Sequence, residues 1–338
     1  MNKTGKTIAV LLAALFLCTG CSGEKIPPKL SEVGFYLDTV ITLTAYTEDK
    51  QILKDALQEC GRYEQLLSRT VEGSDVWRIN HAEGTPVEVP DDTIAILQCA
   101  KKIGDLSGGA FDVTIAPVST LWDFKSGEHT LPDADAIDRA AGLVDYTRMK
   151  IEGKTVTLPA GMMIDLGGIA KGFTGDRVGE IFSQYNIQSG IISLGGNVQA
   201  YGTKTNGKPW RVAIQNPENS MEYLGVLDVQ DKAVVTSGGY ERFFEENGVR
   251  YHHIIDPRTG YPADSGLISA TIVCEKGILA DGLSTSLFIM GKDQAEKFWR
   301  ESDLYFDYIL EDKEGTLYVT EGIADSLMTD AKVEVVYR

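Results

Sequence analysis

Cysteine and histidine are scarce in this 338-residue sequence, which has 5 cysteines and 4 histidines. Beyond the N-terminal region only Cys60, Cys99 and Cys274 remain, an odd and widely spaced set without a Cys-x-x-Cys pair. The spacing excludes a disulfide framework and a zinc site, and we expect these residues to be buried apolar fillers. Repeats, low-complexity segments and a long linker after residue 30 are also absent from the sequence.

Basic residues are few relative to acidic ones. The sequence has 32 Lys and Arg against 49 Asp and Glu, which gives a formal net charge of -17 at pH 7. So acidic a surface excludes nucleic acid as a partner. It also means that a polyphosphate ligand needs local help from a metal ion or from backbone NH groups. Hydrophobic residues make up 43% of the chain, which is ample for a core.

The N-terminus has the order of a secretory signal. Lys3 and Lys6 precede an apolar run over residues 8–17, and this run is shorter than the about 20 residues that span a bilayer. Thr19-Gly20-Cys21 follows and resembles the lipobox of bacterial lipoproteins, although Cys18 stands where Leu is usual. The pattern predicts an exported protein; an ordinary signal peptide with a chance cysteine is the alternative.

These features divide the chain into three parts. We expect residues 1–20 to be a lipoprotein signal peptide and 21–30 to be a polar linker. Residues 31–338 then form the functional domain. A lipid on Cys21 would anchor this domain to the outer face of the cell membrane. Equivalently, the protein would be a lipoprotein that faces the periplasm.

Hydrophobic periodicity predicts a single mixed α+β domain. Helices are expected near 52–67, 92–107, 168–185, 278–290 and 293–301. Strands are expected near 35–46, 190–194, 210–215, 224–229, 233–236, 251–255, 267–274, 305–310, 316–320 and 332–337. A hairpin over 148–158 should turn at Gly153.

A strand-to-helix junction stands out at residues 164–172. A short apolar strand ending at Asp165 meets Gly167-Gly168, and a helix opens directly after it. Such a junction exposes backbone NH groups at the positive end of a helix, and Lys171 adds a cation in the first turn. The pattern predicts an anion site, while close strand–helix packing is the equally good structural interpretation.

A second pattern combines a carboxylate with a hydroxyl. Asp281 and Thr285 are four residues apart, so on a helix their oxygen atoms lie on one face. With a nearby backbone carbonyl they form an incomplete set of hard oxygen ligands, which suits Mg2+ because this ion also takes water and substrate phosphates. An Asp that caps its own helix is the alternative.

Three further segments carry polar and aromatic groups. His253 lies at the end of an expected strand, just before the rigid turn of residues 256–262. A core histidine is the alternative, although the turn residues after it favour a site. The segments 109–122 and 236–242 offer aromatic and hydrogen-bonding partners for a flat heterocycle.

Taken in order, these motifs resemble the ApbE family of FAD:protein FMN transferases over nearly the whole mature chain. The matching stretches are Leu37-Asp38-Thr39, Phe111-Asp112-Val113-Thr114 through Trp122, Asp165 to Gly172, Ser193-Leu194-Gly195-Gly196-Asn197, Thr236-Ser237-Gly238, His253 to Pro262 and Ala280-Asp281 to Thr285. The resemblance implies a T-fold-like α+β fold. It also implies FAD as substrate, Mg2+ or Mn2+ as the ion, and transfer of FMN through a phosphoester bond to a Thr or Ser of an acceptor protein, with release of AMP.

The resemblance also assigns roles to individual residues. FAD would be held by Leu37, Thr70, Ala110, Phe111, Asp112, Asp165, Lys171 and Ile254. The metal would be held by the Gly168 carbonyl, Asp281 and Thr285, and His253 or Asp256 would be the general base. Three positions depart from the family pattern: Leu37 replaces the usual Met, Thr70 replaces a frequent aromatic residue, and Lys171 is matched by Glu in some members.

Three functions follow from these patterns. The first, which the resemblance implies, is FMN transfer to a flavoprotein of a membrane or extracellular electron-transfer system. The second is Mg-dependent hydrolysis of FAD to FMN and AMP at the same site. The third is a passive flavin- or solute-binding lipoprotein, which would have no use for Asp281 and Thr285.

Overall fold

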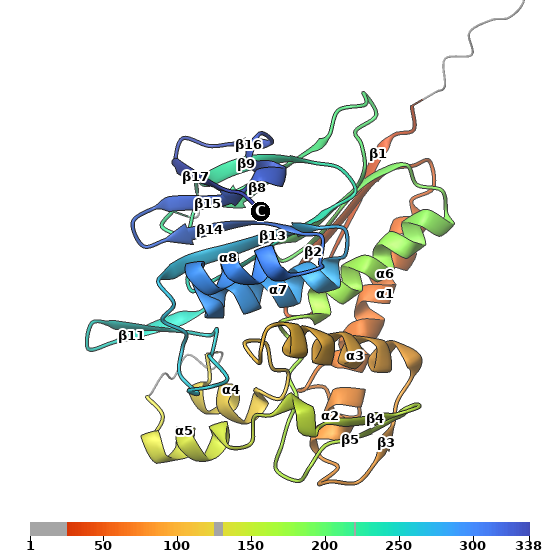
Figure 1. The fold of residues 1–338 in the computed structure, drawn as a ribbon. Helices are drawn as coiled ribbons and strands as arrows, with labels where there is room; N and C mark the ends of the chain where they lie inside the picture. Colours follow the sequence, from red (N-terminus) through yellow and green to blue (C-terminus); the bar gives the residue numbers. More distant parts are fainter. Residues whose placement is uncertain (1–25, 125–130, 220) are drawn as a thin grey trace, which may run out of the picture.

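A nine-stranded mixed sheet forms the centre of the fold (Figure 1). We describe the chain from a computed structural model, which covers residues 26–124, 131–219 and 221–338. In spatial order the strands are β1 (Lys29–Tyr36), β2 (Thr39–Tyr46), β6 (Ser189–Leu194), β7 (Asn197–Gly202), β10 (Ala233–Gly238), β13 (Leu267–Cys274), β14 (Asp307–Asp312), β15 (Thr316–Thr320) and β17 (Lys332–Val336). Neighbours pair antiparallel except β15 and β17, which are parallel.

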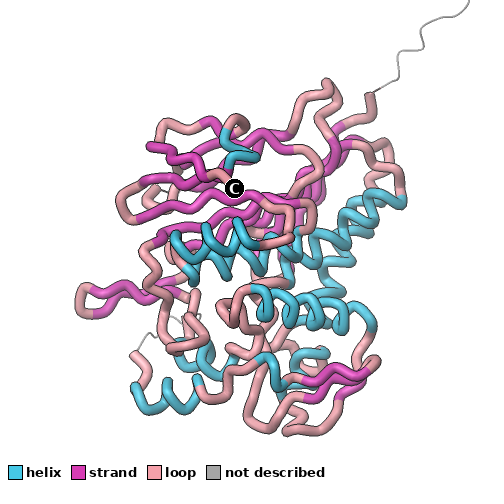
Figure 2. The backbone as a smooth tube through the Cα atoms, viewed as in Figure 1, coloured by secondary structure: helices cyan, strands magenta, loops and turns pink. Residues whose placement is uncertain are grey.

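Helices cover one face of this sheet, and a second small sheet covers part of the other (Figures 1 and 2). The covering helices are α1 (Gln51–Leu67), α6 (Ala170–Gln184), α7 (Gly277–Met290) and α8 (Lys292–Glu301). The small sheet contains β8 (Trp210–Gln215), β9 (Tyr223–Val229) and β16 (Leu327–Met328), and the short α9 (Glu321–Ala324) follows β15. Separate apolar clusters fill each of these layers.

The remaining elements lie on the far side of the helical layer from the large sheet (Figure 1). They are α2 (Asp75–Asn80), β3 (Val87–Glu88), α3 (Asp91–Leu106), α4 (Ala116–Trp122), α5 (Ala134–Ala141), the 3-10 turn η1 (Tyr146–Arg148), β4 (Lys150–Glu152) and β5 (Thr155–Thr157). The two-stranded hairpin of β11 (Phe243–Glu246) and β12 (Val249–His252) projects from the body.

Burial explains why the helices differ in sequence. α1 buries a stripe that includes Leu53, Ala56 and Cys60 and keeps its other face polar. α7 is apolar on nearly all sides because it lies between the large sheet and α3 and α6. Cys60, Cys99 and Cys274 are free and at least partly buried, which confirms the expectation of apolar fillers.

Most expected elements are found within a few residues of their predicted bounds, and the α+β fold class is confirmed. The strand expected over 35–46 is found as β2 but begins only at Thr39, since the chain reverses at Leu37-Asp38 and forms the hairpin of β1 and β2. The strand expected at 251–255 ends earlier, at His252. β1, β7, α2, α4 and α5 were not expected, because these segments lack a clear hydrophobic period.

The N-terminal predictions fall mostly outside the described part of the chain. Residues 1–20, and with them Cys21 of the linker, are not among the described residues. β1 begins at Lys29, inside the segment that we expected to be linker. Within the described ranges, no helix combines the length and the apolar character needed to cross a membrane.

Candidate functional site

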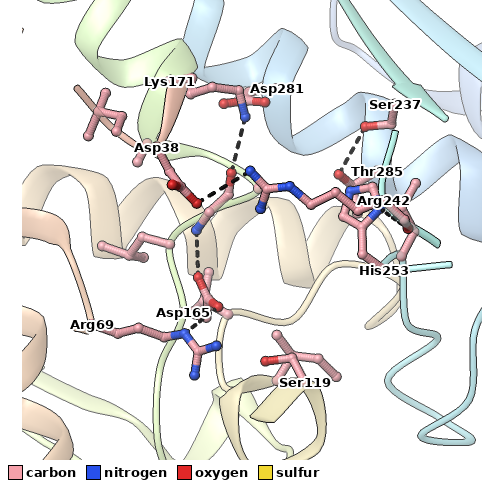
Figure 3. Close-up of a pocket in the computed structure, with 18 of the residues that line it drawn as sticks. Asp38, Arg69, Ser119, Asp165, Lys171, Ser237, Arg242, His253, Asp281 and Thr285 are labelled. Atoms are coloured by element: carbon pink, nitrogen blue, oxygen red, sulfur yellow. Dashed lines mark hydrogen bonds and ion pairs between the residues drawn. The ribbon is translucent and has the colours of Figure 1, made fainter. Parts of the chain in front are cut away.

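A cavity of about 530 Å3 opens between the end of the large sheet and the helices beneath it. Its volume lies within the range of about 300–1,000 Å3 that is usual for small-molecule sites. Figure 3 shows Lys171 and Asp281 at one end of the view, Arg69, Asp165 and Ser119 at the other, and Arg242 and His253 between them.

Of the predicted site residues that the structure describes, all but Asp256 lie at this cavity. Its lining includes Leu37, Thr70, Ala110, Phe111, Asp112, Asp165, Gly168, Lys171, His253, Ile254, Asp281 and Thr285. These residues come from segments far apart in the sequence, so their convergence depends on the fold. What each residue does there remains a prediction.

The α6–α7 junction forms one side of the cavity, which we call the packed wall (Gly168, Gly172, Asp281 and Thr285). The Gly172 amide donates to Asp281 Oδ2 at 2.8 Å. A Cβ on Gly172 would lie 2.1 Å from the Gly277 carbonyl oxygen and 2.7 Å from Asp281 Cβ. Only glycine therefore permits this approach of the two helices, which fixes Asp281 beside the start of α6.

The packed wall gathers oxygen ligands. The Asp281 residue is 4% exposed, and Thr285 lies one helical turn later on the same face of α7. In a regular helix the Gly172 amide would donate to the carbonyl oxygen of Gly168, four residues earlier. Here the Gly172 amide donates to Asp281 instead. Ser237 Oγ lies 3.2 Å from Thr285 Oγ1 and extends the set (Figure 3).

Asp176 holds the two helices in register from outside the cavity. Its carboxylate accepts the Gly277 and Ile278 amides at 2.7 and 3.0 Å and so caps the N-terminus of α7. Burial raises the pKa of Asp176, and these two amide bonds oppose that rise. The residue therefore positions the helix that carries Asp281 and Thr285.

A second part of the cavity lining, which we call the open wall, consists of the Leu37-Asp38 turn, Arg69 and Arg242. Leu37 and Asp38 have φ values of 53° and 61°, the left-handed region that a two-residue hairpin requires and that a leucine rarely adopts. Glu64 Oε1 accepts the Leu37 amide at 2.9 Å, and Asp38 Oδ2 lies 3.4 Å from Arg242 Nη2. These polar contacts hold a strained turn at the edge of the cavity.

Arg69 is a cavity residue that the sequence patterns did not identify. Its Nε lies 2.9 Å from Asp165 Oδ2, and its Nη1 donates to Thr120 Oγ1 at 2.7 Å. Asp165 Oδ1 in turn accepts the Gly167 amide at 2.8 Å. Arg69 lies just after α1 in a segment without a motif, so only its long-range pairing with Asp165 reveals it. Glu64 was missed for the same reason, whereas Ser119 lies within the predicted 109–122 segment but was not singled out there.

Asp112 lines the cavity, but its carboxylate is occupied by the chain itself. Oδ1 accepts the amide and the hydroxyl of Thr114 at 2.7 and 2.6 Å, and Oδ2 accepts the Tyr146 amide at 3.0 Å. Burial raises the pKa of this carboxyl, while the hydrogen bonds oppose the rise. The side chain therefore shapes the loop that presents Ala110 and Phe111.

His253 is half-buried at the cavity. Its Nδ1 lies 3.3 Å from the Arg242 carbonyl oxygen, which only accepts, so Nδ1 carries the proton and Nε2 keeps its lone pair. Burial, followed by the charge of Arg242, lowers the pKa of His253 to about 4. The imidazole is therefore neutral at pH 7 and able to accept a proton.

Asp256, the other candidate base, does not line the cavity. Its carboxylate accepts Arg258 Nε at 2.8 Å and Nη2 at 2.7 Å and also the Arg258 amide at 3.0 Å. These bonds close the turn that precedes Gly260 and occupy the carboxylate with Arg258. The geometry favours His253 over Asp256.

The cavity is acidic despite its three cations. Basic side chains come from Arg69, Lys171 and Arg242. Acidic side chains come from Asp38, Glu64, Asp112, Asp123, Asp165, Glu241 and Asp281. Within residues 26–124, 131–219 and 221–338, no cluster of three or more His, Cys, Asp or Glu side chains could hold a metal. A cation at the packed wall would therefore depend on hydroxyl, carbonyl and ligand oxygens.

The fold and the cavity define an α+β protein with a polar site of the size that takes a nucleotide-like ligand. The family model described as "ApbE family" matches residues 37–309, and the chain belongs to this family. A Klebsiella pneumoniae protein named "FAD:protein FMN transferase" is 35% identical over 259 residues, 75% of this chain and 80% of that protein. A Treponema pallidum protein of the same name is 32% identical over 317 residues, 87% and 88% of the two chains.

A solved structure agrees with these relatives. The crystal structure of the ApbE protein from Thermotoga maritima superposes with a TM-score of 0.82 at 31% identity. The match covers 87% of this chain and 98% of that chain. The resemblance that the motifs indicated is thereby confirmed, together with the fold that it implied.

Proposed function

We propose that this chain is an FAD:protein FMN transferase. It would transfer the FMN half of FAD to the hydroxyl of a Ser or Thr on an acceptor protein and release AMP. The observation that carries the proposal is the convergence of the predicted flavin-binding residues, the packed wall and His253 on one cavity. The names of relatives that match over most of their length support it.

A divalent cation, Mg2+ or Mn2+, fits the packed wall. Asp281 Oδ1, the Thr285 hydroxyl and the Gly168 carbonyl are hard oxygen donors, and Mg2+ commonly uses one or two carboxylates together with substrate phosphates. When bound, the ion supplies charge neutralisation for the pyrophosphate and for the leaving AMP. The excess of acidic side chains around the cavity supports the need for such an ion, because an unaccompanied pyrophosphate would be repelled.

The residues of the chain would orient FAD between the two walls. Lys171, in the first turn of α6, places its ammonium beside the positive end of the helix, where an anion is favoured. Phe111, Ala110 and Ile254 offer apolar surface for the flat rings. Leu37 and Thr70 complete this edge of the cavity. Leu37 has nearly the volume of the Met that is usual in the family, whereas Thr70 is smaller than the frequent aromatic residue.

His253 would act as the general base. The acceptor hydroxyl oxygen attacks the phosphorus of the FMN half, a new P–O bond forms, and the bond from that phosphorus to the bridging oxygen breaks. The hydroxyl proton passes to Nε2 of His253, and AMP leaves with the bridging oxygen. The tautomer set by the Arg242 carbonyl leaves Nε2 available for this step.

Intact-mass spectrometry of an acceptor tests the proposal. The protein is incubated with FAD, Mg2+ and a flavin-carrying subunit of a membrane electron-transfer complex, with the subunit's acceptor Thr replaced by Ala as the control. Gain of one FMN mass on the wild-type subunit alone supports transfer. Free FMN and AMP without an adduct would instead identify FAD hydrolysis, and tight FAD binding without turnover would identify a passive carrier.

We also propose that the enzyme works outside the cytoplasmic membrane, anchored through Cys21. The basic residues, the apolar run and Thr19-Gly20-Cys21 support this placement. Labelled palmitate should mark the wild type, whereas Cys21→Ala should remain unlabelled and be unprocessed or released. A cytosolic wild-type protein that retains Met1 and carries no lipid would overturn this placement.

A further inference from the structure

β1 is an edge strand whose end reaches the cavity. In the described part of the chain β1 pairs with β2 alone, so its outer backbone edge is open to another strand. Figure 1 shows β1 at one end of the large sheet and β17 at the other. An open edge of eight residues is long enough to pair with an extended segment of another chain.

The exposed face of β1 is apolar where it approaches the cavity. Val33 and Phe35 are 61% and 64% exposed, and Val40, the partner that Phe35 faces on β2, is 55% exposed. Residues two apart in a strand share a face, so these three side chains form one patch, the β1 patch. α1 packs against the opposite face of β1, near Gly34 and Tyr36.

Exposure alone does not identify a docking site, because the other edge strand is also apolar. Val333 and Val335 on β17 are 37% and 38% exposed. The two edge strands differ in their position relative to the cavity. Phe35 and the Leu37-Asp38 turn line the cavity, whereas no residue of β17 does. The β1 patch is thus continuous with the cavity opening, and Val33 lies about 7 Å along the strand from Phe35.

We propose that the acceptor protein docks on β1 as an added strand, with apolar side chains on the β1 patch. This inference rests on the proposed function, which requires a macromolecule to deliver a hydroxyl into the cavity. A segment paired along β1 runs towards the Leu37-Asp38 turn, so the residues that follow it enter between the two walls. Backbone pairing supplies affinity for a varied sequence, and alternate apolar side chains supply the register.

Val33→Asp tests the docking site, with Val333→Asp on β17 as the matched control. Val33 is exposed and does not line the cavity, so the substitution should leave the fold and FAD binding intact. The substrate is the acceptor subunit that the wild type flavinylates in the mass-spectrometric experiment. Val33→Asp should raise KM for this subunit about tenfold or more, because a charge replaces an apolar contact, while KM for FAD stays unchanged.

The outcomes separate this inference from the proposed function. If the wild type flavinylates the subunit and Val33→Asp does so with unchanged KM, the docking site is wrong and the function stands. If Val333→Asp raises KM equally, apolar exposure and not position is responsible, which also overturns the inference. A wild-type dimer that Val33→Asp dissociates in sedimentation velocity would assign the β1 patch to a second copy of the chain. Absence of transfer by the wild type would reject the proposed function itself.

Discussion

The two walls of the cavity are built in different ways. The packed wall rests on helix contacts so close that a single Cβ at Gly172 would overlap a backbone oxygen at 2.1 Å. The open wall rests on partly exposed ion pairs, with side chains that are 27% exposed at Arg69 and 43% at Arg242. Buried packing tolerates little displacement, whereas exposed ion pairs contribute little energy and adapt easily. Under the proposed function, the core would therefore fix the side that meets the phosphates, and the side that meets the acceptor would be adjustable.

The largest effect on turnover should come from His253, which lies between the walls. His253→Ala should lower the rate of FMN transfer by about 10²–10⁴, the usual contribution of a positioned base, and leave the FAD affinity nearly unchanged. FAD binding is measured by flavin fluorescence and transfer by the mass of the acceptor. Normal transfer by a folded mutant would return His253 to a structural role.

The pH dependence of the wild-type rate also tests whether His253 is the general base. The base acts when neutral, so kcat/KM should hold as pH falls and be lost only near the lowered pKa of about 4 in the free enzyme. Arg242→Ala should move this loss to higher pH, because the cation helps to lower the pKa of His253. An acid limb that stays at about 6.5 in the wild type would contradict the assignment.

The sequence predicted the packed wall better than the open wall, for physical reasons. Asp281 and Thr285 lie on one helix, where spacing alone places side chains on one face, and Gly168 and Lys171 belong to a local strand–helix junction. Arg69 and Glu64 join the cavity through tertiary contacts between segments without a motif, and Ser119 was not singled out within its 109–122 segment. The Leu37-Asp38 turn was hidden because leucine rarely adopts a positive φ and no glycine or asparagine follows Asp38 to mark a two-residue hairpin.

Gly172→Ala should break the packed wall. The added methyl forces the two helices apart, at a cost of about 1–3 kcal/mol in the free energy of unfolding, and moves Asp281 away from Gly168. Gly179→Ala, on the same helix with nothing within 4 Å of its Cβ, is the matched control and should be neutral or stabilising. Chemical denaturation and metal titration measure both variants. Equal stability of the two would show that the close approach is unimportant.

Arg69→Ala and Arg242→Ala should have the smallest effects on turnover, because both change only the open wall. Asp165 loses an ion-pair partner that is partly exposed, and such pairs contribute about 0–1 kcal/mol. We expect KM for FAD to rise by less than about tenfold with kcat preserved, and a smaller change for Arg242→Ala, whose ion pair with Asp38 is longer at 3.4 Å. A loss of kcat as large as that of His253→Ala would show that the open wall takes part in the chemistry.

Binding of Mn2+ to the packed wall is the measurement that tests the account most directly. Electron paramagnetic resonance counts free and bound Mn2+ in the wild type and in Asp281→Ala, with and without FAD. The wild type should bind Mn2+, and FAD should tighten this binding because its phosphates complete the ligand set. Asp281→Ala should weaken binding by more than about 100-fold, beyond the loss typical of residues that only support a ligand. Wild-type affinity in a folded Asp281→Ala protein would contradict the central claim that the packed wall holds the cation.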